Sequence, residues 1–183
     1  MDLLQWKILF ITCTIVGWVA YIYLRWKTNP TLLSYWGFRA DNLRTTLFRL
    51  IPLAVLALIA FLIIGYTRET IQVTWHIIPI LIIYPIWGTI QQFLCVGIVT
   101  GNLQDMSRPV PKILNVLITA LLFSTLHYPN LWLMAGTFVL AIIYSIVYLR
   151  ERNLLALGLF HGWLGAIFYY SVVGRDPFAE VFG

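Results

Sequence analysis

Four polar side chains within otherwise apolar segments are the residues of this sequence that could do chemistry: Gln91, Gln92, His127 and His161. Amides and imidazoles can hydrogen-bond across helices, and a neutral imidazole can act as a general base or ligate a metal. A glutamine amide has no titratable proton near neutrality and cannot act as a base itself. Polar groups at membrane depth tend to face a cavity or one another. We therefore expect at least one glutamine to converge with both histidines on one internal cavity.

The composition around these residues is that of an integral membrane protein. Of the 183 residues, 61% are hydrophobic and 10% are charged, whereas soluble domains average about 25% charged residues. The length suits one compact bundle, so we expect a single transmembrane domain over residues 1–183. The net charge of +5 does not indicate a nucleic-acid partner, because in membrane proteins the placement of Lys and Arg sets the orientation.

Six apolar runs are candidate membrane-spanning helices. They are Ile8–Leu24, Leu47–Tyr66, Thr74–Val99, Ile113–Leu126, Leu131–Leu149 and Leu154–Val173. Pro79 and Pro85 lie within the third run and should kink it. The sequence thus predicts an all-α membrane protein built as a bundle of about six transmembrane helices.

Basic residues are divided unequally between the two ends of these runs. Of the 12 Lys and Arg residues, only Lys7, Arg68 and Arg175 fall on the side of the chain termini. The positive-inside rule then predicts that both termini lie outside the cytoplasm, as in a bacterial inner membrane.

The depths of the polar residues conflict with simple convergence. The third run leads inward, which would place Gln91 near its inner end, whereas His161 would lie about 10 Å and His127 about 22 Å from the inner side. Only Tyr128–Asn130 separates the fourth run from the fifth. We therefore expect these two runs to form a hairpin whose tip stays buried in protein, which would bring His127 to the cavity.

Small residues surround His161. Gly158 and Gly162 in GLFHG match the small-xxx-small spacing that lets two helix backbones approach closely in a membrane. The sixth run is therefore expected to pack closely on another helix beside His161.

Three motifs around these residues resemble those of the CAAX-protease and bacteriocin-processing (CPBP, or Abi) family of intramembrane proteases. The family pattern is EExxxRG on one helix, FxxxH on the next and HxxxN on a later one. Here QQFLCVG, FSTLH and HGWLG stand at these places, beginning at Gln91, Phe123 and His161. The resemblance runs from about residue 84 to 165 and implies a CPBP-like fold with this stretch as its core.

The resemblance also implies which positions would be catalytic. In the family, the first glutamate is taken to activate a water with the help of the histidines, and the asparagine to stabilise the oxyanion. The equivalent catalytic positions here are Gln91, Gln92, His127 and His161. Near-isosteric amides replace both glutamates, Val96 replaces the arginine and Gly165 replaces the asparagine. The resemblance therefore implies a divergent member that keeps the fold and lacks the glutamate base.

Three functions remain open on this evidence. The first is a proteolytically inactive subunit or assembly factor of a larger membrane complex, with other membrane proteins and the bilayer as partners and no nucleic acid. The second is an intramembrane protease or hydrolase with altered chemistry at His127 and His161. The third is a pigment, haem or lipid site that uses His76, His127 or His161. No cofactor is predicted, and His127 and His161 would be the metal ligands if there are any, although two ligands make a poor zinc site.

Overall fold

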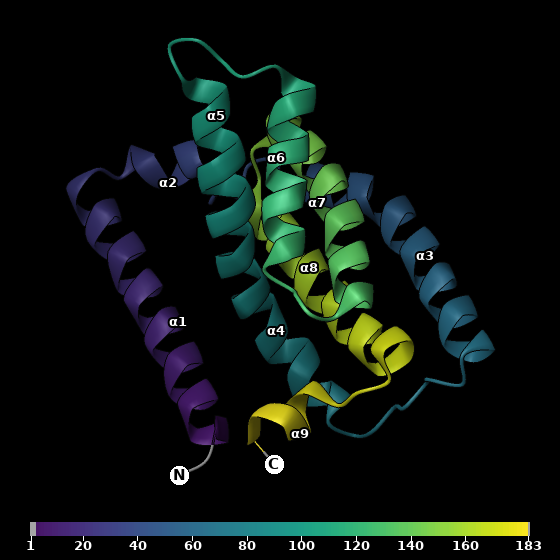
Figure 1. Ribbon diagram of the computed structural model, residues 1–183. Helices are drawn as coiled ribbons and strands as arrows, with labels where there is room; N and C mark the ends of the chain where they lie inside the picture. The colour runs from purple at the N-terminus through teal and green to yellow at the C-terminus, as the bar shows by residue number, and fades with distance from the viewer. Residues whose placement is uncertain (1–2, 183) are drawn as a thin grey trace.

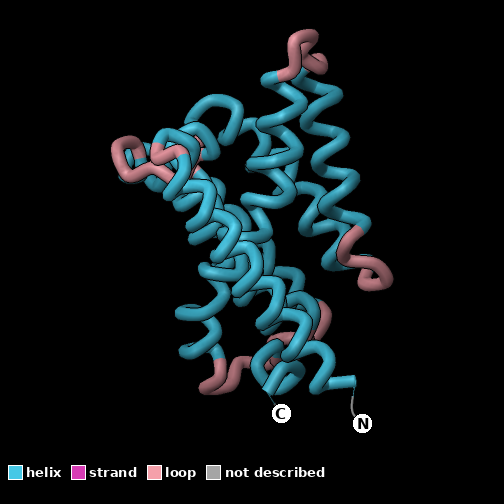
Figure 2. Tube along the Cα trace, turned by 90° about the vertical axis from the view of Figure 1, so that its left-hand side faces the viewer, coloured by secondary structure: helices cyan, strands magenta, loops and turns pink. Residues whose placement is uncertain are grey.

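The computed structural model describes residues 3–182, and all regular structure in this range is helical (Figure 1). The elements are α1 (Leu3–Thr28), α2 (Thr31–Trp36), α3 (Leu43–Thr67), α4 (Ile77–Gln92), the π-helical segment η1 (Phe93–Thr100), α5 (Gly101–Asp105), α6 (Lys112–Thr125), α7 (Leu131–Glu151), α8 (Leu154–Phe168), the π-helical segment η2 (Tyr169–Val173) and α9 (Pro177–Phe182). Figure 2 shows that short connections join these helices into one bundle. The predicted all-α membrane bundle is confirmed.

Five of the described helices are long and apolar enough to cross a membrane. They are Leu9–Thr28, Leu43–Thr67, Ile77–Asp105, Leu131–Glu151 and Leu154–Val173. The fourth predicted span is instead α6, whose 14 residues give a length of about 21 Å, short of the roughly 30 Å of a hydrocarbon core. The predicted bundle of about six helices thus consists of five helices of spanning length and one shorter apolar helix, α6, among the described residues. Pro111 immediately precedes α6, and the turn that follows the helix contains Pro129.

The turn between α6 and α7 lies within the height of the bundle, well short of the end that carries the chain termini (Figure 1). This agrees with the expected hairpin. The tip, however, is not covered by other described segments, because Leu126 is 65% exposed and Tyr128 is 75% exposed. The expectation of a tip buried in protein is therefore wrong, and this turn leaves one side of the bundle open.

Glycines hold α4 and α8 together at the centre. A Cβ atom added to Gly88 would lie 2.7 Å from the carbonyl oxygen of Gly158, and one added to Gly162 would lie 2.4 Å from the backbone nitrogen of Pro85. Backbone therefore packs directly against backbone, with no room for a side chain. The close approach expected from Gly158 and Gly162 is confirmed, and α4 is the partner helix.

A proline strengthens the same contact. The chain stays helical through Pro79, in the first turn of α4, and through Pro85. Because Pro85 has no N–H, the carbonyl of Leu81 loses its donor within the helix. The indole N–H of Trp163, on α8, donates to that carbonyl at 3.1 Å. The proline thus exposes a backbone acceptor that α8 uses.

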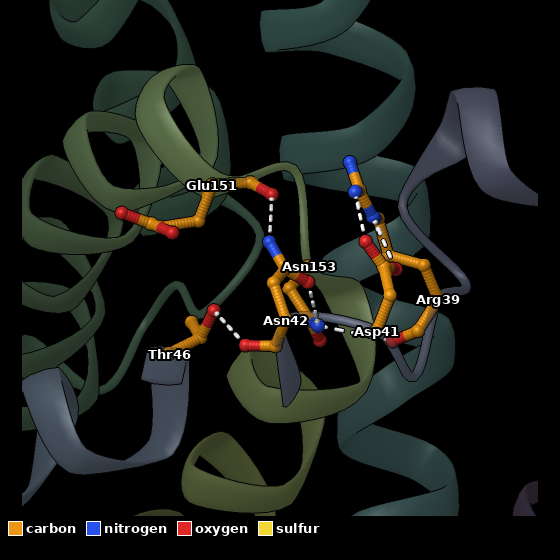
Figure 3. A network of polar contacts seen from close by, with 6 residues as sticks. All are labelled: Arg39, Asp41, Asn42, Thr46, Glu151 and Asn153. Carbon is orange, nitrogen blue, oxygen red and sulfur yellow. Dashed lines mark hydrogen bonds and ion pairs between the residues drawn. The ribbon is translucent and has the colours of Figure 1, made fainter. Parts of the chain in front are cut away.

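At the end away from the termini, polar side chains hold the connection before α3 against the turn between α7 and α8 (Figure 3). The amide nitrogen of Asn42 donates to the carbonyl of Glu151 at 2.7 Å, and that of Asn153 donates to the side-chain oxygen of Asn42 at 2.7 Å. Gly37 has φ +100°, and a Cβ there would lie 2.7 Å from the carbonyl oxygen of Arg152. Only glycine fits both the conformation and the contact at this position.

At the opposite end, Asp176 joins three segments. It accepts hydrogen bonds from Thr74 at 2.8 Å and from Tyr170 at 2.8 Å, and it pairs with Nδ1 of His76 at 2.6 Å. Burial raises the pKa of Asp176, but these hydrogen bonds outweigh burial and hold the pKa below its usual range. His76 therefore has a structural partner here and lies outside the polar centre.

We predict that Gly162→Ala lowers the free energy of unfolding by about 1–3 kcal/mol, the usual cost of overpacking, because the new methyl group would meet the backbone of α4. Gly165→Ala is the matched control on the same helix, since a Cβ there meets nothing within 4 Å. Thermal unfolding in detergent, followed by tryptophan fluorescence, measures the difference. Equal midpoints for the two variants would contradict the proposed backbone contact.

Candidate functional site

The contact between α4 and α8 places Gln91 beside His161. Gln91 follows Gly88 by three residues, and His161 lies between Gly158 and Gly162, so both side chains flank the glycine contact on neighbouring turns. Nε2 of His161 donates to Oε1 of Gln91 at 2.9 Å. His161 is buried and Gln91 is half-buried. The family's first glutamate position is thus filled by an amide that bonds one of the histidines.

His127 reaches the same region from the turn after α6. Its Nδ1 donates to the carbonyl of Phe123, four residues earlier, at 2.8 Å. The ring of Phe123 contacts both histidines, with centroids 5.0 Å from His127 and 5.6 Å from His161. The FxxxH spacing therefore fixes the orientation of His127 through one backbone acceptor and one aromatic ring.

The depth conflict has a structural explanation. The helix that begins at Ile77 continues through η1 and α5 to Asp105, beyond the predicted end at Val99. Gln91 consequently lies near the middle of this helix and not near its inner end. Because α6 is short, His127 also lies within the bundle. Gln91 and His127 therefore lie at similar depths along it.

Gln91, His127 and His161 line one cavity of about 330 Å³. Most of the other lining side chains are aromatic, aliphatic or small. They are Phe61, Tyr84, Trp87, Leu126, Leu133, Gly136, Thr137, Leu140, Gly162, Leu164, Gly165, Phe168 and Tyr169. No acidic residue occurs among the described residues that line this cavity. Its polar groups are therefore amide, imidazole and hydroxyl.

Gln92 does not share this cavity. Successive helical residues point about 100° apart, and Gln92 is fully buried, with neither amide atom bonded to a described residue. Val96 is also fully buried and belongs to the apolar core with Phe93 and Tyr144. The positions of the family's second glutamate and of its arginine are therefore packed into the protein interior here.

Gly165 lies at the cavity wall, and a Cβ there would meet nothing within 4 Å. A longer side chain at this position would consequently project into open space. At the position of the family's asparagine, this chain therefore has no side chain, and the space beside Gly165 could hold one.

The hydrogen bonds define what each histidine offers. Because a carbonyl oxygen can only accept, neutral His127 carries its proton on Nδ1, and its Nε2 has a lone pair with no hydrogen-bond partner among residues 3–182. His161 donates from Nε2, so its buried Nδ1 is a lone pair with no partner among the described residues. Because Nδ1 of His161 is buried and its Nε2 is bonded to Gln91, His127 is the one of the two histidines that can accept a hydrogen bond at the cavity. The described residues contain no cluster of three or more His, Cys, Asp or Glu that could hold a metal ion.

Several residues of this region were not anticipated. Tyr84 and Trp87 line the cavity on the same face of α4 as Gln91, and their helical spacing could have identified them. A second buried polar cluster joins η1, α6 and α7. The hydroxyl of Thr100 lies 2.8 Å from that of Thr119 and 3.3 Å from that of Ser145 on α7. The amide of Asn115 donates to the carbonyl of Thr100 at 3.0 Å. This cluster connects helices and does not line the cavity.

The two glutamines differ sharply in surroundings, and this gives a direct prediction. Gln92→Glu should lower the free energy of unfolding by several kcal/mol more than Gln91→Glu, because it places an unpaired carboxylate in the interior. Gln91→Glu places its carboxylate beside His161 at the cavity. Chemical denaturation of both variants in the same detergent provides the comparison. Equal destabilisation would show that both positions share one environment, contrary to the structure.

A comparison with known protein families matches residues 70–167 to the type II CAAX prenyl endopeptidase Rce1-like family. No curated protein and no solved structure matches the chain. The matched segment begins before α4 and ends within α8, so it contains Gln91, His127 and His161. It covers more than half of the sequence and includes the stretch from 84 to 165 in which the motifs were found. The chain belongs to the type II CAAX prenyl endopeptidase Rce1-like family.

Proposed function

We propose that this chain is a proteolytically inactive member of its family, which acts as a subunit or assembly factor of a larger membrane complex. The observation that carries the proposal is the hydrogen bond between Gln91 and His161. An amide occupies the place where the family motif has a carboxylate, and it is engaged with a histidine as a neutral group.

Loss of the carboxylate removes the general base. Positioned proton transfer typically contributes about 10²–10⁴-fold to the rate of an enzyme, and no described residue at the cavity supplies another carboxylate. An oxyanion donor contributes roughly 10²–10³-fold, and Gly165 offers no side chain for this role. Either loss would slow hydrolysis severely, although the two need not add.

The outer helices support a binding role. None of the apolar segment of α1 is buried within the protein, and 11% of that of α3 is buried, compared with 67% of that of α8. Figure 1 shows α1 at the edge of the bundle, where it reaches the core mainly through Trp18, whose ring centroid lies 6.0 Å from that of Phe93. These two helices offer long apolar faces to neighbouring transmembrane segments as well as to lipid. We further propose a bacterial inner membrane location with both termini outside the cytoplasm, in line with the unequal distribution of basic residues.

A hydrolase with altered chemistry is the second candidate. Nε2 of His127 carries a lone pair at the cavity and could accept a proton from water without a carboxylate. A pigment or haem site would also use this imidazole, and an absorption spectrum of the purified protein would reveal it.

The first test is a cleavage assay with prenylated CAAX-type peptides. We expect no cleavage by the purified natural chain above the rate measured for its His161→Ala variant, because the base is absent. The variant Gln91→Glu with Gly165→Asn restores a carboxylate and an amide at the cavity and avoids the buried position 92. Cleavage by the natural chain that is lost in His127→Ala or His161→Ala would contradict inactivity and favour the altered hydrolase.

Co-isolation tests the second half of the proposal. A tagged chain extracted from native membranes with a mild detergent should carry other membrane proteins in fixed proportion, which mass spectrometry would identify. A tagged chain that purifies alone under several mild detergents would contradict the role as a subunit.

A further inference from the structure

Acidic and basic residues are unequally matched at the end of the bundle away from the chain termini. Its three described acids, Asp41, Asp105 and Glu151, already have partners. Arg39 pairs with Asp41, Arg49 pairs with Glu151, and Arg152 pairs with Asp105 at 2.5 Å. Figure 3 shows the first of these pairs. The remaining basic residues at this end therefore keep an uncompensated positive charge.

Two of these unmatched basic residues line a groove on the outside of α6 and α7. Lys112 begins α6, and Arg150 lies in the last turn of α7. Both are exposed, and neither has an ion-pair partner among the described residues. Because the two helices run in opposite directions, both cations lie at the same end of one groove of about 380 Å³.

The rest of the groove is apolar. Its walls are Ile113, Val116 and Leu117 from α6 and Ile142, Ile146 and Leu149 from α7. Along both helices these side chains lead away from the two cations and toward the middle of the bundle. The groove thus combines a positive end at the membrane interface with an apolar channel at acyl-chain depth.

The start of α6 adds to the positive end. The residue before it is Pro111, and no side chain caps the first turn, which contains no acidic residue. The partial positive charge of a helix N-terminus favours an anion at this place. It supplements the two side-chain cations and would not form a site without them.

We propose that this groove binds an anionic glycerophospholipid, with its phosphate between Lys112 and Arg150 and an acyl chain along α6 and α7. Within a bilayer, the apolar walls give little preference for one lipid over another, because every lipid supplies a similar chain. Selectivity must come from the head group. Arginine can bind phosphate through two parallel hydrogen bonds, and lysine adds a compact charge. This inference is independent of the proposed function.

The size of the expected preference follows from the charges. Each basic residue near an anionic lipid surface contributes roughly fivefold to binding, so two residues should favour an anionic lipid over a zwitterionic one by roughly 30-fold. Neutralising both should reduce the preference by a similar factor.

Native mass spectrometry of the full chain in detergent tests the proposal with phosphatidylglycerol and phosphatidylcholine of identical acyl chains. We expect the natural chain to bind the first phosphatidylglycerol roughly 30-fold more tightly. Lys112→Gln with Arg150→Gln should abolish this preference. The matched control, Arg25→Gln with Lys27→Gln, removes two cations from the end of α1 on the same side and should preserve it.

Three results would overturn the proposal. Equal loss of preference in both double variants would show that general surface charge, and no specific site, attracts the lipid. Unchanged preference in Lys112→Gln with Arg150→Gln would exclude these residues. A third variant, Ile146→Trp, fills the groove and keeps both cations, so it should weaken phosphatidylglycerol binding. Soluble glycerophosphoglycerol, which has no acyl chains, should not compete, and effective competition would contradict the role of the groove.

Discussion

The centre of the molecule depends on the direct contact between the backbones of α4 and α8. Gly88 packs against Gly158, and Gly162 packs against Pro85. The backbones are so close that a Cβ atom at Gly88 or Gly162 would collide with the other helix. Helices in a membrane gain little from apolar burial against each other, so close van der Waals packing and interhelical hydrogen bonds must hold them. The bond from Trp163 to the carbonyl freed by Pro85 adds one such interaction.

This contact explains why a polar centre can exist in lipid without a charge. It brings the amide of Gln91 within hydrogen-bond distance of His161, and the glycines keep that distance fixed. An amide costs less to bury than a carboxylate, and here it is partnered. The helix packing is therefore maintained at the position where the family motif has a glutamate and this chain has Gln91. The same arrangement that would orient a catalytic carboxylate now orients a neutral group, which is consistent with a binding role for the chain.

Much of this arrangement could be predicted from the sequence. Long apolar runs indicate the helices, and the spacing of Gly158 and Gly162 indicates close packing beside His161. The bounds of α6 could also be predicted, because the apolar run Ile113–Leu126 differs from the observed helix Lys112–Thr125 by one residue at each end. The level of Gln91 was misjudged because the helix continues beyond Val99 into polar residues, where hydropathy no longer marks it. Gln92 is buried away from the cavity because of the face of α4 that meets α8. The sequence alone does not show that face, so it could not predict which of the two glutamines lines the cavity.

The central claim, that Gln91 holds His161 through Nε2, can be tested directly by nitrogen-15 NMR of the imidazole in histidine-labelled protein. The account predicts that His161 carries its proton on Nε2 and that Gln91→Leu shifts this resonance, whereas Gln92→Leu leaves it in place. A proton on Nδ1, or a resonance that responds to Gln92→Leu and not to Gln91→Leu, would contradict the account.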